Sequence, residues 1–330
     1  MLPVVLMLQV VHNTLLIPAE EQKVLVGAEQ VLGHPVEDVR LQVDKCENFP
    51  IYLNEGHPHM WGWPTTNNKN ASVLFFMIEF SLIDAHIHVG QFREIYETPA
   101  ELVTYLTKVG VGHFAVSSST IAEEDYDKVI GEMKELVSLG KDRVLPVLWL
   151  TPLSLHNGGM DRMLNCGIEW KCIKIHPWLS FGGWGEDNDD REIAISIARD
   201  LQVPLLIHTG ETEGSYPSCF DHSIAKHPDV TFILAHGRPV NEAIELMQKY
   251  ENVWVDTAFM PTPNIVKCCE AGFVDRVLWG SDYPIPKYFY PEEDMMEYYA
   301  NVLDELKQSV SQEDFTIITQ TNALRLFKVN

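Results

Sequence analysis

The sequence predicts an α/β protein, a closed (β/α)8 TIM barrel with an N-terminal extension. Short apolar runs alternate with longer segments of helical composition, and eight such runs occur between residue 77 and the end of the chain. Strands that alternate with helices form a parallel sheet, and parallel strands are buried on both faces, so they appear as nearly unbroken apolar runs. A barrel of this kind takes about 250 residues. No glycine-rich dinucleotide-binding turn follows the first run, which disfavours an open doubly wound sheet.

The eight expected strands are short and rich in β-branched residues. They are residues 80–85, 113–117, 144–150, 172–176, 205–208, 231–235, 253–256 and 277–280. Helices are expected between them, at 98–109, 123–139, 191–201, 239–250 and 291–308. The segment 322–327 has the pattern of an amphipathic helix, and we expect it to cap the barrel.

Residues 1–76 do not share this alternation. They end in an irregular stretch that contains three prolines, at positions 50, 58 and 64, and a polar run at 65–70. We therefore expect two parts, an extension over 1–76 of a few strands and a catalytic barrel over 77–330. The chemical motifs described below follow the barrel strands, and none of them falls in the extension. The barrel is therefore expected to hold its site without the extension.

Composition narrows the range of partners. A hydrophobic fraction of 46% with 22% charged residues is typical of a globular protein with a sizeable core. The formal charge of −23 argues against nucleic acid or an anionic membrane as a partner and leaves a small-molecule substrate. The apolar start of the chain is too short to span a bilayer. The six cysteines show no CxxC pair, and we expect reduced thiols in a cytoplasmic protein.

The strongest chemical signal is a His-x-His pair, His86 and His88, at the end of the first expected strand. Residues two apart on a strand point to the same side, so both imidazoles can face one point. Further polar residues end other strands: His176, His208, His236 and, after the eighth, Asp282. In a barrel the carboxyl ends of all strands converge on one face. Neutral imidazoles with a carboxylate favour zinc, with manganese or iron as alternatives.

These motifs resemble those of the amidohydrolase superfamily. They are DAHIH at 84–88, KIHP at 174–177, IHTG at 207–210, LAHG at 234–237 and GSDYP at 280–284. The branch they resemble is the amidohydrolase-related one, which includes aminocarboxymuconate semialdehyde decarboxylase and the resorcylate decarboxylases. The resemblance covers about residues 80–328 and not 1–76.

The resemblance implies one divalent metal, bound by His86, His88, His208 and Asp282. It gives His236 the role of orienting or deprotonating the water that reacts, and Asp282 could also move a proton. The resemblance further suggests homodimers.

Two residues allow more than one interpretation. In binuclear members of the superfamily a carboxylated lysine at the end of the fourth strand bridges two metals, and Lys174 could do so here. We prefer the interpretation with one metal, in which Lys174 and His176 would contact the substrate. Arg238 is either an anchor for a substrate carboxylate or half of a surface ion pair. Trp178 follows the fourth strand and is expected to line the substrate pocket.

The preferred function is metal-assisted hydrolysis of an amide, ester or lactone in a small substrate. The alternative is a nonoxidative decarboxylase, which needs the same metal and acid–base groups, and release of carbon dioxide would distinguish it. A third hypothesis is a barrel that binds a ligand without catalysis. The complete set of histidines and an aspartate at the strand ends disfavours it.

Overall fold

The computed structural model describes residues 9–11, 14–16, 82–177, 184 and 189–329. The chain divides into two compact units, Met1–Met60 and Trp61–Asn330. In the first unit, the described residues form the antiparallel pair β1 (Gln9–Val11) and β2 (Thr14–Leu16). The expected boundary between residues 76 and 77 lies outside the described residues and stays a prediction.

The second unit contains eight parallel strands that pair in the order of the chain. They are β3 (Leu82–Phe92), β5 (Val111–Ser118), β6 (Val144–Trp149), β7 (Cys172–Ile175), β8 (Leu205–His208), β9 (Phe232–Ala235), β10 (Val253–Asp256) and β11 (Val277–Leu278). Each coincides with an expected strand, most of them within two residues at the ends. The strand β4 (Ile95–Glu97), which pairs antiparallel with the end of β3, was not predicted.

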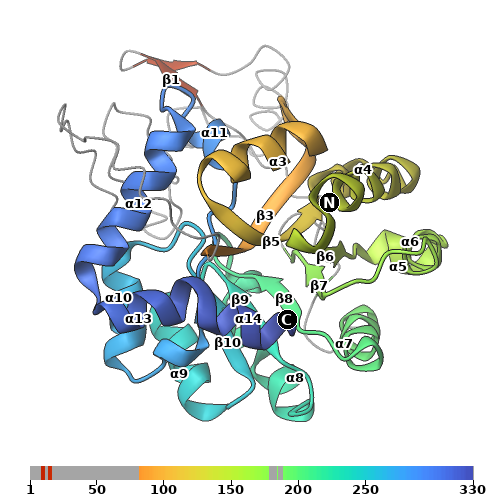
Figure 1. Cartoon of the computed structure of the whole chain (residues 1–330). Coiled ribbons are helices and arrows are strands. Elements are labelled where there is room, and N and C mark those ends of the chain that lie inside the picture. Colours follow the sequence, from red (N-terminus) through yellow and green to blue (C-terminus); the bar gives the residue numbers. More distant parts are fainter. Residues whose placement is uncertain (1–8, 12–13, 17–81, 178–183, 185–188, 330) are drawn as a thin grey trace, which may run out of the picture. The chain divides into compact units, whose positions relative to one another are not determined.

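Backbone hydrogen bonds close the sheet between its first and last strands. The amide of Ala85 donates to the carbonyl of Trp279 over 2.8 Å, and that of His88 donates to Tyr283 over 2.7 Å. In return, the amide of Asp282 donates to the carbonyl of His86 over 2.8 Å. The sheet is therefore a barrel, and the fold prediction is confirmed. Figure 1 shows the helices arranged around the strands.

Helices follow the strands. They are α3 (Pro99–Lys108), α4 (Tyr126–Gly140), α5 (Pro152–His156), α6 (Gly159–Leu164), α7 (Asp189–Leu201), α8 (Asp221–Lys226), α9 (Val240–Lys249), α10 (Thr262–Glu270), α11 (Pro286–Phe289), α12 (Met295–Ser309), α13 (Gln312–Thr316) and α14 (Asn322–Phe327). The six helices that the sequence predicted, now α3, α4, α7, α9, α12 and α14, are among them. The start of α3 shows why the sequence folds there: Thr98 and Glu101 form a capping box that satisfies two free backbone amides. Among the described residues, no helix has the length and apolar character that crossing a membrane requires.

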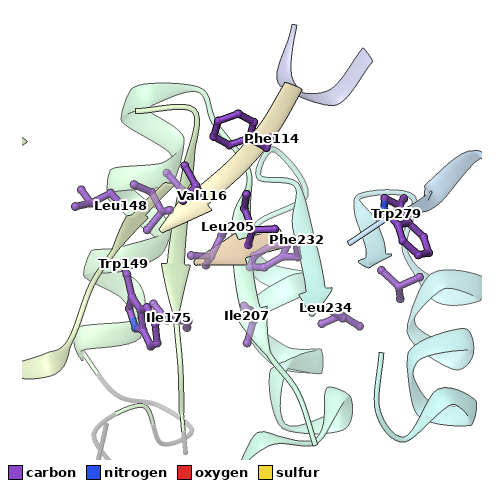
Figure 2. Close-up of a cluster of buried hydrophobic side chains, with 14 of the residues drawn as sticks. Phe114, Val116, Leu148, Trp149, Ile175, Leu205, Ile207, Phe232, Leu234 and Trp279 are labelled. Carbon is purple, nitrogen blue, oxygen red and sulfur yellow. The ribbon is translucent and has the colours of Figure 1, made fainter. Parts of the chain in front are cut away.

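Alternate residues of each strand enter two separate apolar layers. On β8, Leu205 and Ile207 face the helices, and Leu206 faces the barrel interior. Figure 2 shows part of the outer layer, with Leu205 and Ile207 among its side chains. The interior layer is completed by Ala323 and Phe327 of α14, which confirms that this helix caps the barrel. With the interior filled from this end, the polar residues collect at the carboxyl ends of the strands.

Candidate active site

Three predicted ligand atoms converge at the carboxyl end of the barrel. His88 Nε2 lies 3.1 Å from Asp282 Oδ1, and His86 Nε2 lies 3.5 Å from the same oxygen. All three side chains are buried, and their ligand atoms lie within 4.8 Å of one another. Burial alone would raise the pKa of Asp282, but His86 and His88 hold it well below its usual range, so this carboxylate is an anion. Burial and the charge of Lys174 lower the pKa of His88 to about 3, so this imidazole is neutral.

Gly280 makes room for this arrangement. A Cβ atom at this position would lie 2.9 Å from the Cβ of His86, closer than real contacts of this kind. The glycine in the motif at 280–284 therefore lets the turn after β11 approach β3 closely. This approach brings Asp282 beside His86.

Lys174, on β7, points its amine into the same group of atoms. Its Nζ lies 2.8 Å from His86 Nε2 and 3.1 Å from His88 Nε2. Burial lowers the pKa of Lys174 to about 8, so the amine is still mostly charged at neutral pH and acts as a donor. A cationic nitrogen thus already lies against two of the three ligand atoms. Two imidazoles and a carboxylate around one cation fit a divalent metal of the zinc type.

His236 and His208 form a second group beside the first. His236 donates from Nδ1 to the carbonyl oxygen of Ala258 over 2.8 Å, and its Nε2 lies 3.0 Å from His208 Nδ1. Burial, reinforced by Arg238, lowers the pKa of His236 well below its usual value. His236 is therefore a neutral base, and its ring centroid lies 5.2 Å from that of His86.

Glu211 holds the other side of this second group. Its carboxylate contacts His208 Nε2 and accepts from Arg238 Nη2. Burial alone would raise the pKa of Glu211, but His208 and Arg238 lower it to about 2. Arg238 therefore forms an ion pair in the structure, although with a largely buried partner and not at the open surface.

The structure thus brings together His86, His88 and Asp282, with His236 next to them. Both ring nitrogens of His208 face other side chains, His236 and Glu211, and the clusters of candidate ligands among the described residues do not include it. Ligation by His208 stays a prediction. The ring of His176 stacks on that of His208, with centroids 3.6 Å apart. Trp178 lies outside the described residues.

Sequence reasoning missed three polar residues of the site. Asp256 accepts from His86 Nδ1, Ser117 lies 3.1 Å from His88 Nδ1, and Glu211 contacts His208. The signal for Asp256 was available, because it is a carboxylate at the end of an apolar strand, the same position that singled out the histidines. Glu211 comes three residues after His208 and lies beyond the strand, where only the fold shows its direction.

A family model described as amidohydrolase matches residues 83–329. The chain belongs to the amidohydrolase family. This match spans nearly the whole described barrel and confirms the resemblance seen in the motifs. No curated protein matches this amidohydrolase.

Solved structures share the barrel at low sequence identity. An uncharacterised TIM-barrel protein from Bordetella bronchiseptica superposes with a TM-score of 0.57 at 15% identity, covering 75% of this chain and 98% of its own. A probable 2-pyrone-4,6-dicarboxylic acid hydrolase from Acinetobacter baumannii, with citric acid bound, has a TM-score of 0.55 at 13% identity, covering 75% and 99%. The 5-carboxyvanillate decarboxylase from Sphingomonas paucimobilis has a TM-score of 0.52 at 11% identity, covering 76% of this chain and 100% of its own. At sequence identities this low, the structural similarity shows a shared fold and nothing further. The family, with hydrolases and decarboxylases among its structural neighbours, supports an enzyme.

Proposed function

We propose that this amidohydrolase is a metal-dependent hydrolase of a small amide, ester or lactone. His86, His88 and Asp282, joined by His208, would hold one divalent cation, with zinc preferred over manganese or iron. The observation that carries the proposal is the convergence of two imidazole nitrogens and a carboxylate oxygen on one buried point, where the Lys174 amine already supplies positive charge. A cation there lowers the pKa of water and polarises a carbonyl oxygen.

His236 is the proposed general base. Because its Nδ1 proton is committed to the carbonyl of Ala258, its Nε2 is the atom that can accept a proton. The low pKa of this buried ring keeps Nε2 unprotonated before the reaction. The proton that it takes from water would then pass to the leaving group, with Asp282 as the second proton carrier.

Lys174, His176 and Arg238 are the proposed substrate contacts. A cation bound between His86 and His88 would displace the Lys174 amine from their Nε2 atoms, and the freed amine would donate to the substrate. A substrate carboxylate would compete with Glu211 for Arg238, because Glu211 holds that guanidinium in the structure. A bridging role for Lys174 between two metals is the alternative, and metal stoichiometry distinguishes the two.

A nonoxidative decarboxylase is the second candidate. The same ligand atoms and the same base would serve it, and a decarboxylase is among the similar barrels. Small carboxylic acids incubated with the enzyme decide between the two, since carbon dioxide release indicates the lyase and cleavage without it the hydrolase.

Elemental analysis tests the metal site directly. The purified protein should carry about one tightly bound divalent metal per chain, and the double variant His86→Ala/His88→Ala should lose it because two ligand atoms are gone. His222→Ala is the matched control, since His222 is exposed on α8. Unchanged metal content in the double variant would exclude this site.

A further inference from the structure

Asp256, at the end of β10, is a fully buried carboxylate with three hydrogen-bond donors around it. Its Oδ2 lies 2.9 Å from His86 Nδ1. Its Oδ1 accepts from the backbone amides of His236 and Ala258, each over 3.0 Å. Both oxygens are therefore engaged, and one of their partners is the ring of a proposed metal ligand.

The two contacts of the His86 ring decide where its proton lies. The Lys174 amine lies 2.8 Å from Nε2, and an ammonium group can only donate, so Nε2 holds the lone pair. The proton is then at Nδ1, which donates to Asp256 Oδ2 over 2.9 Å. The two contacts agree on one tautomer, the one that leaves Nε2 free to bind a metal.

The same carboxylate holds the backbone of His236 in an unusual conformation. The φ angle of His236 is +66°, in the left-handed region that residues other than glycine rarely adopt. The bond from its amide to Asp256 Oδ1 lies at this bend, and the amide of Ala258 shares that oxygen. Strained residues at functional sites persist when their surroundings fix them in several ways.

We propose that Asp256 is a positioning residue that fixes the Nδ1–H tautomer of His86 and the backbone of His236. One buried side chain thereby orients a metal ligand and the general base together. The part of this inference that concerns the metal rests on the proposed function. The tautomer of His86 does not depend on it.

Two neighbouring residues, the proposed ligand His88 and the buried carboxylate Asp84, lack the pairing that Asp256 makes with His86. Ser117 contacts Nδ1 of His88, and its hydroxyl can donate or accept, so it allows either tautomer there. Asp84 is as deeply buried as Asp256, but its partners are the backbone amides of His86 and Ser281 and the hydroxyls of Ser281 and Tyr299, with no imidazole ring among them. Asp84→Asn is therefore a matched control for Asp256→Asn.

The decisive variant is Asp256→Asn. The two backbone amides require the amide oxygen on their side, so the amide NH2 group must face His86 Nδ1. That group donates, which moves the proton of His86 to Nε2, the atom that should bind the metal. Long-range ¹H–¹⁵N NMR of histidine-labelled protein without added metal reports this tautomer, and a His86→Gln spectrum assigns the signal. We expect an Nδ1–H imidazole in the parent and in Asp84→Asn, and an Nε2–H imidazole in Asp256→Asn.

A zinc titration against a competing chelator supplies the second measurement. Removing such an outer partner of a ligating histidine weakens metal binding by about 10–100-fold, and Asp84→Asn should keep the parent's affinity. An Nε2–H imidazole in the parent, which needs no variant to fold, would overturn the assignment, as would an unchanged tautomer in Asp256→Asn. A switched tautomer with unchanged zinc affinity would overturn the link to metal binding. A parent with the expected tautomer that binds no zinc would support the role of Asp256 in the tautomer and refute the proposed function.

Discussion

At the scale of single residues, the two proposed catalytic side chains share a backbone feature. His236 and Asp282 have φ angles of +66° and +60°, both in the left-handed region. Each follows a strand, and each amide is held by a neighbour: Asp256 accepts from His236, and the carbonyl of His86 accepts from Asp282. Such conformations cost about 1–3 kcal/mol and collect at functional sites. The sequence shows which residues end the strands but not this turn of the backbone, because it depends on partners from other strands.

His236→Asn tests the base. Because His236 is a proposed base and not a ligand, the variant should keep the parent's metal content and lose turnover by roughly 10²–10⁴ on any substrate that the parent cleaves. Metal analysis and steady-state kinetics on the same preparation measure both, with His222→Asn as the surface control. In the binuclear alternative, His236→Asn and Lys174→Ala would each remove one of two metals, so metal loss in either variant contradicts the mononuclear assignment.

Asp282→Asn should behave differently from His236→Asn. Its carboxylate is both a proposed ligand and a proton carrier, and a neutral amide is a poorer ligand and no base. We expect metal affinity and activity to fall together, as measured by chelator competition and by kinetics. Full metal affinity in this variant would remove Asp282 from the ligand set.

At the scale of elements, the strands were the most predictable part. A strand buried on both faces, such as residues 205–208, needs an apolar run, and this requirement is visible in the sequence. Strand β4 has only three residues and pairs because the end of β3 lies beside it, so its sequence carries no such signal. The site likewise has a part that the sequence predicts and a part that it does not. The predicted ends of the strands show where its histidines lie. The side chains that these histidines contact, such as Asp256 and Glu211, are brought to them only by the closed sheet.

The closure of the barrel gives a prediction at this scale. Tyr299, on α12, donates to Asp84 Oδ2 over 3.0 Å and accepts from Trp279 Nε1 over 3.0 Å. Tyr299→Phe would leave a buried carboxylate oxygen and a buried N–H without this partner, at a cost of about 1–3 kcal/mol. Urea unfolding of the variant should show this loss. Tyr298→Phe is the matched control one residue earlier on the same helix, because none of the hydrogen bonds among the described residues involves its hydroxyl. Equal stability of both variants would mean that this contact does not stabilise the closure.

At the scale of the whole molecule, the barrel explains how residues far apart in the chain form one site. His86 and Asp282 are separated by almost the full length of the barrel sequence, and they meet because the first and last strands pair. The family match and the described barrel elements cover nearly the same residues, 83–329 and 82–329. The proposed ligands and base all fall within that range. The part of the chain before it supplies none of them.

A chain that starts at Met77 should therefore keep its metal site. It contains every strand from β3 to β11 and the capping helix α14, so both apolar layers and all proposed ligands are present. We expect its metal content and zinc affinity to equal those of the full chain. A second chain that starts at Trp61, the first residue of the second compact unit, separates two reasons for failure. If the chain from Met77 folds but loses its metal while the chain from Trp61 keeps it, residues 61–76 belong to the catalytic part and the boundary expected from the sequence is wrong. If both chains fold and both lose it, residues before 61 contribute to the site.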